Sequence, residues 1–488
     1  MIVLSYQPKN FREFKKALRY AIENDAEIFE VRGEKLSEKE LIKILTEKSL
    51  PKIFTYRINQ FSYSKIKDAS KKYRIALQHN VEFIDVDINL GKSFINKLKK
   101  EIKETKLILS YHNYEKTPKL KHLIQILDYS RKISADYYKI VTFANSVIDN
   151  YSILKLLEIA SRKGIKLISH CMGEYGKAGR FLSYKNGSLF FYSSYNSNKQ
   201  TADGQISLDI LNKIFNIKQL YPSTRVYGII GNPLKQSKSW LFHNFGFQIT
   251  KSNAIYLNFP TNDLSEFIYH FKNYIRGLSI TIPFKEEILN IPNISSSLIK
   301  EIGSANTALF KDSKPILFNT DYLGFKEIVK KEKRLQNSKV LVIGAGGSAR
   351  TVVYTLKKFK NEIFIINRNY DRAKNLADEM EIEAINQRKK FDYNFDVIIN
   401  TTPGNNPFLL NLFKKIISQQ KPKLVVDLDL NFKESKLLSM CKSNKIKTIN
   451  GFEFFVAQAV HQFKIFTGKN ISLRKVKKFV LENYEKQF

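Results

Sequence analysis

The chain has 488 residues, enough for three domains at about 100–200 residues each. Hydrophobic residues make up 43% of it and charged residues 26%, which excludes a wholly disordered chain. A net charge of +35 would suit an anionic partner such as nucleic acid, a lipid surface or a small anionic substrate. A biased coding composition produces the same excess of lysine, and the lysines are spread along the chain, so charge alone selects no partner.

The cysteine content and the apolar runs set expectations about compartment. Cys171 and Cys441 are too few for a disulfide framework or a metal cluster. A short apolar run before Pro8 is unlike a signal peptide, and no later stretch approaches the roughly 18 apolar residues of a membrane span. We expect a cytoplasmic protein with no metal, no membrane partner and no nucleic-acid partner, since no basic recognition helix is visible. An oligomer is compatible with this sequence, which carries no mark of one.

The first 217 residues alternate short β-branched or aromatic runs with longer amphipathic stretches. Strands joined by helices pair in parallel, and eight such units in this length are typical of a (β/α)8 barrel. The eight runs are 1–6, 26–32, 51–57, 81–88, 106–112, 137–143, 165–172 and 188–194. We therefore predict an α/β chain whose first domain, residues 1–217, is a (β/α)8 barrel.

Polar side chains occur at the ends of several of these runs, where the active sites of such barrels lie. Glu30, Arg32, Arg57 and His112 hold these positions. Lys139 stands inside the apolar run YYKIVTF, where an ammonium that faces the barrel interior must be paired or neutral. A Lys139 that points outward between helices fits the pattern equally well.

In the second half, strand-like runs alternate with helical stretches in two separate series. One series begins after Pro222, and another begins near residue 335. We expect a substrate-binding domain over 225–334, completed by C-terminal helices at about 455–488. Between these parts we expect a Rossmann domain over 335–454.

The expected Rossmann domain opens on the strand VLVI, a glycine-rich turn and a helix, which is typical of a dinucleotide site. The predicted cofactor-binding residues of this turn are Gly344, Ala345, Gly346, Gly347, Ser348 and Ala349. An acidic residue at the end of the next strand would bind the ribose of NAD, but Asn367 and Arg368 stand there, with Arg372 one turn later. This pattern favours NADP(H). A structural glycine turn with surface arginines is the alternative.

Residues from 225 to the C-terminal helix resemble shikimate dehydrogenase. The matching motifs, in order, are GNPLKQSKSWLFHN, LSITIPFK, IGSANTALF, FNTDYLGF and NGFEFFVAQAVHQF. The resemblance implies that Ser237 and Ser239 hold the substrate carboxylate and that Lys285 and Asp321 are catalytic. It also implies substrate contacts from Thr281, Asn306 and Gln458, and a cofactor contact from Gly451.

The implied pair suits the reaction. Reduction of a ring ketone needs a hydride from the nicotinamide, a proton donor near the developing alkoxide, and groups that fix the hydroxyls. A lysine beside an aspartate is a positioned, charged proton donor. The aspartate can also accept a hydrogen bond from a substrate hydroxyl.

The first half resembles type I 3-dehydroquinate dehydratase, a (β/α)8 enzyme that forms a Schiff base. The matching segments are FEVR, TYR, LSYHNYEKTP, ADYYKIVTFAN, MGEYGKAGR and TADGQ. The resemblance implies Lys139 as the nucleophile, and His112 is then the natural proton shuttle. It implies that Arg180 binds the substrate carboxylate. The remaining implied substrate contacts are Ser5, Glu30, Arg32, Arg57, Thr201 and Gln205.

The two resemblances fit one another, because 3-dehydroshikimate is the product of the first reaction and the substrate of the second. We therefore expect a bifunctional enzyme that converts 3-dehydroquinate to 3-dehydroshikimate and then, with NADPH, to shikimate. The Glu-Gly-Gly segment of the dehydratases is absent after Arg57, where INQFSYS follows. One alternative is therefore a dehydrogenase whose barrel has decayed into a scaffold. Another is a basic nucleic-acid-binding chain with relic motifs.

Overall fold

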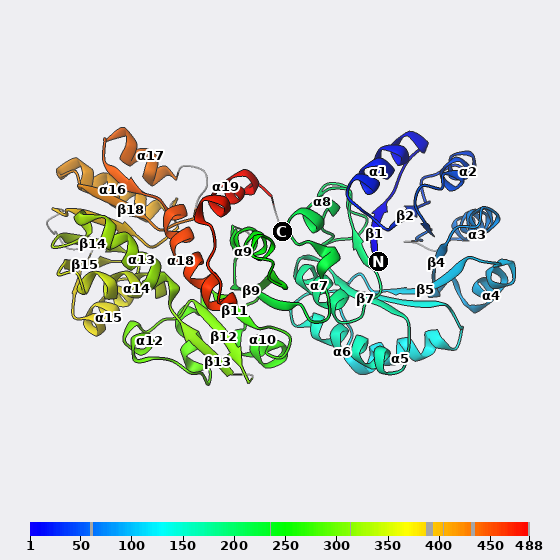
Figure 1. Ribbon diagram of the computed structural model, residues 1–488, viewed down its shortest axis with the longest axis horizontal. Helices are drawn as coiled ribbons and strands as arrows, with labels where there is room; N and C mark the ends of the chain where they lie inside the picture. The colour runs from blue at the N-terminus through cyan, green and yellow to red at the C-terminus, as the bar shows by residue number, and fades with distance from the viewer. Residues whose placement is uncertain are drawn as a thin grey trace. The chain divides into compact units, whose positions relative to one another are not determined.

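The computed structural model describes all residues except 59–61, 235, 313, 387–393, 404, 431–434 and 487–488. The chain divides into two compact units, Met1–Thr224 and Arg225–Gln487 (Figure 1). None of the helices in the described ranges is long and apolar enough to cross a membrane.

The first unit is a parallel sheet of strands that alternate with helices (Figure 1). Its strands are β1 (Ile2–Tyr6), β2 (Ile28–Arg32), β3 (Lys52–Thr55), β4 (Phe83–Asp87), β5 (Lys106–His112), β6 (Tyr137–Phe143), β7 (Leu167–Met172) and β8 (Phe191–Ser193). Its helices are α1 (Phe11–Glu23), α2 (Glu38–Thr46), α3 (Tyr63–Gln78), α4 (Lys92–Glu101), α5 (Leu120–Arg131), α6 (Asp149–Arg162), α7 (Lys177–Lys185) and α8 (Leu208–Lys213).

The strands pair in chain order from β1 to β7, and β8 pairs with β1. Between β7 and β8 the amide of Leu189 donates to the carbonyl of Leu167 at 3.2 Å, which brings the last two strands together. The predicted (β/α)8 fold is confirmed.

The interior of this unit is layered, because side chains two residues apart on a strand point to the same face. An apolar floor is formed by Val3, Ile28, Ile53, Phe83, Ile108, Tyr137, Ile168 and Phe190. Two residues further along the strands stand side chains that are all buried and polar: Ser5, Glu30, Thr55, Asp85, Ser110, Lys139, His170 and Tyr192. Lys139 therefore lies in this polar layer, on the apolar floor, and not between the helices.

The first sheet of the second unit has the order β10-β9-β11-β12-β13, with its last two strands antiparallel to their neighbours. The strands are β9 (Arg225–Gly231), β10 (Ala254–Pro260), β11 (Gly277–Ile280), β12 (Thr307–Lys311) and β13 (Lys314–Phe318). The helices are α9 (Ser239–Ile249), α10 (Leu264–Phe271), α11 (Phe284–Glu287), α12 (Ser297–Ile302), α13 (Thr320–Lys331), α18 (Gly451–Thr467) and α19 (Leu473–Asn483). The C-terminal helix α18 packs on α13, and the Tyr227 hydroxyl donates to Phe466 O at 2.6 Å, so the chain returns to this sheet at its end.

The second sheet of this unit is parallel, with the order β16-β15-β14-β17-β18-β19. Its strands are β14 (Lys339–Ile343), β15 (Glu362–Ile366), β16 (Glu383–Ala384), β17 (Val397–Asn400), β18 (Leu424–Asp427) and β19 (Lys447–Ile449), and its helices are α14 (Gly347–Lys357), α15 (Tyr370–Met380), α16 (Pro407–Gln419) and α17 (Lys436–Ser443). Alternate residues of β14 enter separate apolar clusters on the two faces of the sheet, as in a doubly wound fold. The strand order reverses beside β14, where such sheets bind ligands, so the predicted Rossmann fold is confirmed.

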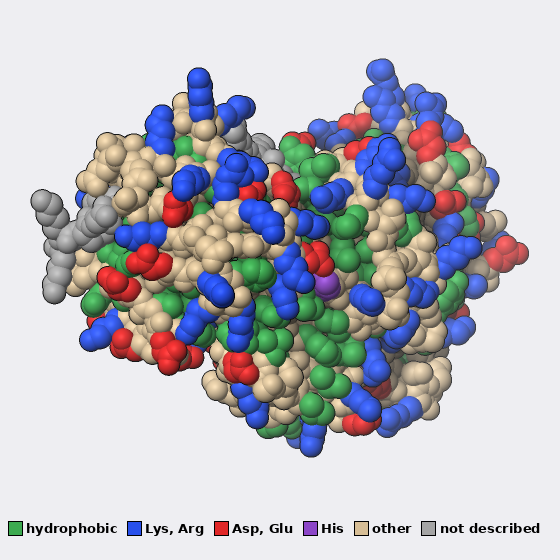
Figure 2. Space-filling view, turned by 60° about the vertical axis from the view of Figure 1, so that its left-hand side comes forward, with side chains coloured by type: hydrophobic (Ala, Val, Ile, Leu, Met, Phe, Trp, Pro, Cys, Tyr) green, Lys and Arg blue, Asp and Glu red, His purple; other side chains and the backbone are tan. Residues whose placement is uncertain are grey.

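Positive charge is not confined to one region of the surface. Figure 2 shows Lys and Arg side chains across the whole visible face, with Asp, Glu and apolar side chains between them. This face therefore presents a dispersed positive charge and no single basic stripe.

Candidate active sites

A cavity of about 190 Å³ lies above the apolar floor of the first unit. Eight of the predicted residues line it: Glu30, Arg32, Arg57, His112, Lys139, Arg180, Thr201 and Gln205. Ser5 is not in the lining. Its hydroxyl donates to the carboxylate of Glu30 and lies 2.6 Å from the hydroxyl of Thr201, so it supports these two side chains.

Lys139 is surrounded by groups that compensate an ammonium charge. Its Nζ lies 2.8 Å from Asp85 Oδ2, 3.9 Å from Glu30 Oε1 and 3.9 Å from the ring centroid of Tyr192. Burial alone would raise the pKa of Asp85, but Arg57 and Lys139 outweigh it and hold this pKa well below its usual range. Asp85 is therefore an ionised carboxylate next to Lys139 Nζ, and a lysine acts as a nucleophile only in its neutral form.

Two arginines of the predicted set are already bound to carboxylates. Arg57 donates from Nη2 to Asp85 at 2.7 Å, and Arg32 donates from Nε to Glu34 at 2.9 Å. Burial lowers the pKa of Arg57, but Asp85 and Asp87 more than reverse this effect and raise it. In this state Arg57 acts mainly to fix the carboxylate beside Lys139.

His112 ends β5 and carries an unused ring nitrogen. Its Nδ1 is buried, has no hydrogen-bond partner among the described residues, and lies 3.9 Å from Asp87 Oδ2. The ring of Tyr114 stacks on the imidazole at 5.8 Å. Asp87 thus offers a carboxylate near His112 in a chain that lacks the Glu-Gly-Gly segment, where residues 59–61 lie outside the described ranges.

The pH dependence of dehydration follows from His112. Burial, with added repulsion from Arg57 and Lys139, lowers the pKa of His112 well below 6.5, so the imidazole is neutral at pH 7. A base is lost only when pH falls through its folded-state pKa. We expect kcat/KM for dehydration to stay constant between pH 7.5 and pH 6.5 and to decrease only at lower pH. A half-maximal value near pH 6.5 in the pH profile would contradict this reading.

Arg180 provides an uncompensated positive charge in the same cavity. Its Nη2 donates to the Asp203 carbonyl at 2.9 Å, and its buried Nε has no partner in the described ranges. Burial lowers the pKa of Arg180 to about 10, so the side chain stays charged at pH 7. No carboxylate of the described residues lies within ion-pair distance of it. A planar fork of this kind suits a substrate carboxylate.

Sequence patterns missed several residues of this cavity. Asp85, Asp87, His170 and Tyr192 were not predicted, although each lies in or beside the polar layer. The available signal was their position: each stands two or four residues beyond the apolar floor on its strand.

A second cavity, of about 420 Å³, lies in the second unit. The predicted residues that line it are Ser237, Ser239, Thr281, Lys285, Asn306, Asp321, Gly451 and Gln458. Ser239 is the first residue of α9, and the Ser237 hydroxyl lies 3.4 Å from the Ser239 hydroxyl. A helix N-terminus with two hydroxyls is suited to a carboxylate.

Two amide side chains of the same cavity lining are fixed through one threonine. The backbone N–H of Thr320 donates to Asn306 Oδ1 at 2.7 Å, and its hydroxyl donates to Gln458 Oε1 at 3.2 Å. This leaves both amides in defined orientations for hydroxyl groups of a ligand.

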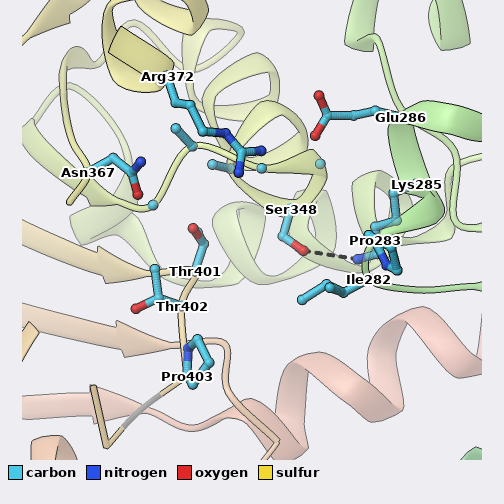
Figure 3. Close-up of a pocket in the computed structure, with 15 residues that line it drawn as sticks. Ile282, Pro283, Lys285, Glu286, Ser348, Asn367, Arg372, Thr401, Thr402 and Pro403 are labelled. Carbon is cyan, nitrogen blue, oxygen red and sulfur yellow. Dashed lines mark hydrogen bonds between the residues drawn. The ribbon is translucent and has the colours of Figure 1, made fainter. Parts of the chain in front are cut away.

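Lys285 and Asp321 form the polar centre of this unit. The Lys285 Nζ lies 2.6 Å from Asp321 Oδ2. It also donates to the Ser348 hydroxyl at 2.9 Å (Figure 3). Gly347 allows this approach, since a Cβ there would come within 2.8 Å of Lys285 Cβ. Lys285 also lines a third cavity, so it lies at the junction of two binding spaces.

The third cavity, of about 260 Å³, surrounds the glycine-rich turn at the start of α14. All six predicted residues of the turn line it, together with Asn367 and Arg372 (Figure 3). Gly344 has φ +113°, and a Cβ there would come within 2.3 Å of Thr401 Oγ1, so only glycine fits. Arg368 is exposed and outside this lining, and the structure places Gly451 at the substrate cavity instead.

Comparison with known proteins connects both units to one pathway. Family models match type I 3-dehydroquinase over residues 4–222, the shikimate dehydrogenase substrate binding domain over 229–308, and shikimate/quinate 5-dehydrogenase over 326–431. The bifunctional 3-dehydroquinate dehydratase/shikimate dehydrogenase of Arabidopsis thaliana, a chloroplastic protein, is 30% identical over 480 residues, which cover 92% of this chain and 79% of that protein. The chain belongs to this bifunctional family.

Other relatives match one half. The NADP(+) shikimate dehydrogenase of Aquifex aeolicus is 34% identical and covers 50% of this chain and 92% of its own length. A structure of Thermus thermophilus shikimate 5-dehydrogenase in complex with NADP(H) and shikimate is 25% identical, with a TM-score of 0.46, and covers 53% of this chain and 99% of that one.

This member of the family is a bifunctional enzyme of the shikimate pathway. It has 3-dehydroquinate dehydratase and NADP-dependent shikimate dehydrogenase activities, as the sequence predicted. In the described ranges no group of three or more His, Cys, Asp or Glu side chains could hold a metal ion.

Proposed function

We propose that the dehydratase reaction takes place in the barrel cavity through a Schiff base on Lys139. The observation that carries this proposal is one cavity lined by a buried lysine paired with Asp85, a neutral histidine, and a buried arginine that has no carboxylate partner among the described residues. An amine that attacks a ketone forms an iminium, which acidifies the neighbouring C–H bond. His112 takes that proton and gives it to the ring hydroxyl, which leaves as water while the enamine returns to a conjugated iminium. Hydrolysis of that iminium frees Lys139. Arg180 holds the carboxylate of 3-dehydroquinate throughout.

Chemical trapping tests this assignment. Sodium borohydride reduces an iminium to a stable amine, so substrate added with it should attach covalently to the enzyme. We expect the added mass on the peptide that contains Lys139. Trapping on another lysine, or equal trapping in a Lys139→Ala variant, would contradict the proposal.

We propose that 3-dehydroshikimate is reduced to shikimate in the cavity of about 420 Å³, with NADP(H) in the adjoining cavity. The glycine-rich turn, with Gly344 at positive φ and α14 opening directly after it, fits a pyrophosphate. When bound, NADPH supplies a hydride. Lys285 gives a proton to the carbonyl oxygen of the substrate and is held in place by Asp321. Ser237 and Ser239 bind the carboxylate, and Thr281, Asn306 and Gln458 fix the hydroxyls.

The preference for NADPH is proposed to come mainly from Arg372. Arg372 reaches from α15 toward the glycine-rich turn (Figure 3), while Arg368 lies outside the cavity lining. Because NADPH and NADH differ only in the 2′-phosphate, Arg372→Ala should raise KM for NADPH about 10-fold or more and change KM for NADH little. Steady-state kinetics with both cofactors measure this, with Arg368→Ala as the matched variant. Equal losses for both cofactors in Arg372→Ala would remove this role.

A reducing compartment such as the cytoplasm remains our proposal for the protein. Both cysteines are buried and unpaired, which is compatible with such a compartment. We also propose that the enzyme needs no metal ion.

A further inference from the structure

The substrate cavity of the second unit contains two buried polar side chains that the roles above do not use. Ser279, on β11, is 6% exposed, and Gln462, on α18, is 2% exposed. Both line the cavity of about 420 Å³ together with Lys285 and Asp321. The two side chains are far apart in the sequence and meet in one hydrogen bond, in which the Ser279 hydroxyl donates to Gln462 Oε1 at 2.6 Å.

Gln462 uses its whole hydrogen-bonding capacity in the fold. Its Oε1 accepts from the Ser279 hydroxyl and lies 3.1 Å from His243 Nε2. Its Nε2 donates to Thr307 Oγ1 at 2.7 Å and to the carbonyl oxygen of Asn306 at 3.3 Å. An amide nitrogen only donates, and a carbonyl oxygen only accepts. The Asn306 carbonyl therefore fixes which end of the Gln462 amide faces which neighbour.

The histidine in this network carries no charge at neutral pH. Burial lowers the pKa of His243 to about 3, so its imidazole is neutral at pH 7. Because Gln462 Oε1 only accepts, the proton of the imidazole is on Nε2 and is donated to that oxygen. The order of donors and acceptors around Gln462 is therefore the same throughout the neutral pH range.

The amide oxygen of Gln462 determines what Ser279 offers to a ligand. Ser279 has one hydroxyl proton, which is donated to Gln462. The Ser279 oxygen also lies 2.5 Å from the hydroxyl of the buried Tyr256, and Tyr256 is the donor of this pair because the serine proton is already used. One lone pair of the serine oxygen remains. Toward the cavity that it lines, Ser279 is thus an acceptor.

The amide nitrogen of Gln462 acts on Asn306 through Thr307. Because Thr307 Oγ1 accepts from Gln462, its own proton is available to Asn306 Oδ1, to which it donates at 2.9 Å. The backbone N–H of Thr320 donates to the same Oδ1. Among the described residues, Asn306 Nδ2 donates only to Thr320 Oγ1, at 2.9 Å. One N–H of the Asn306 amide is left for a ligand, so Asn306 is a donor in this cavity.

We propose that Gln462 is a positioning residue for the reduction, and that it sets the hydrogen-bonding character of the substrate cavity. Through Ser279 it presents an acceptor to a hydroxyl of 3-dehydroshikimate, and through Thr307 it holds Asn306 as a donor to another substrate oxygen. This inference rests on the proposed site of reduction and adds Ser279 to the groups that contact the substrate. These bonds exist in the bound substrate and in the transition state alike, so they contribute to binding and not to the chemical step.

The test is steady-state reduction of 3-dehydroshikimate by variants of the full chain. Gln462→Met keeps the length of the side chain and removes both arms of the network. It should raise KM for 3-dehydroshikimate about 10-fold, while kcat and KM for NADPH change less than about 2-fold. Ser279→Ala and Thr307→Val each remove one arm and should raise the same KM about 3-fold. In a Gln462→Met background, Ser279→Ala should raise KM by a smaller factor than it does alone.

The matched control is a second buried hydrogen bond to the same helix. Tyr227 is the register partner of Tyr256 in the pairing of β9 with β10, and its hydroxyl donates to the carbonyl of Phe466 on α18 at 2.6 Å. Tyr227 is outside the cavity lining. Tyr227→Phe should therefore lower the thermal transition temperature and leave KM for 3-dehydroshikimate unchanged.

The outcomes separate this inference from the proposed site. An unchanged KM in folded Gln462→Met, or an equal rise of KM in Tyr227→Phe, would overturn the positioning role. If Gln462→Met does not fold, Ser279→Ala and Thr307→Val decide, and an unchanged KM in both would overturn it. Wild-type kcat in Lys285→Ala would instead overturn the site of reduction itself, whatever the Gln462 variants show.

Discussion

Lys139→Ala should lower dehydration of 3-dehydroquinate by at least ~10³-fold and leave reduction of 3-dehydroshikimate unchanged, because it removes the amine that bonds to substrate. No other lysine lines the barrel cavity among the described residues, so no neighbour can substitute for it. The measurement is the initial rate of each reaction with its own substrate. Reduction by the same protein sample reports that the second unit is intact.

Folding of the first unit needs its own control in this experiment, since the substitution leaves Asp85 and Glu30 without their cation. A near-native thermal transition and far-ultraviolet spectrum would show that the barrel is folded. Lys163→Ala, an exposed position at the end of α6, is the matched variant and should keep full activity. Residual dehydration within about 10-fold of wild type in folded Lys139→Ala would contradict covalent catalysis at this residue.

Lys285→Ala should lower kcat for reduction about 10³-fold with a much smaller change in KM, because the lost proton donor acts mainly in the transition state. The 2.6 Å pair with Asp321 and the 2.9 Å hydrogen bond to Ser348 fix this ammonium at the junction of the two cavities. Dehydration should be unaffected. Steady-state kinetics with 3-dehydroshikimate and NADPH measure the effect.

An exposed lysine on α12 supplies the control for this variant. Lys300→Ala should reduce 3-dehydroshikimate at the wild-type rate. If Lys285→Ala loses affinity with an unchanged kcat, Lys285 binds substrate and does not donate the proton. If a folded Lys285→Ala or Lys139→Ala protein loses both activities, the division of the chain into two independent sites is wrong.

The fold could be predicted from the sequence because periodicity and turn chemistry both reflect local rules. Alternating runs and helices predict parallel sheets, and the strand VLVI followed by Gly344 predicts a dinucleotide turn whether or not the rest of the chain is known. The direction of Lys139 could not be predicted, since an apolar run of seven residues has no polar face that identifies its interior side. The floor residue Tyr137 settles that direction, and its role depends on the other strands.

The parts of the site that the sequence missed, or could not place in one cavity or another, depend on tertiary contacts. Asp85 and His170 lie within strands and not at their ends, so attention to strand ends misses them. The sequence alone does not show which of Arg368 and Arg372 faces the cofactor. The path of the chain from β15 into α15 brings only Arg372 into the cavity lining. Gly451 approaches Asp429 O so closely that a Cβ would lie 2.0 Å away, a contact between two separate segments that gives no local signal.

This chain carries two working sites, and a single-pot assay tests that claim most directly. Purified protein receives 3-dehydroquinate and NADPH, and the conjugated intermediate and the loss of NADPH are followed together. We expect NADPH to be consumed and shikimate to form from 3-dehydroquinate alone. NADPH consumption only after 3-dehydroshikimate is supplied would show an inactive barrel and contradict the account.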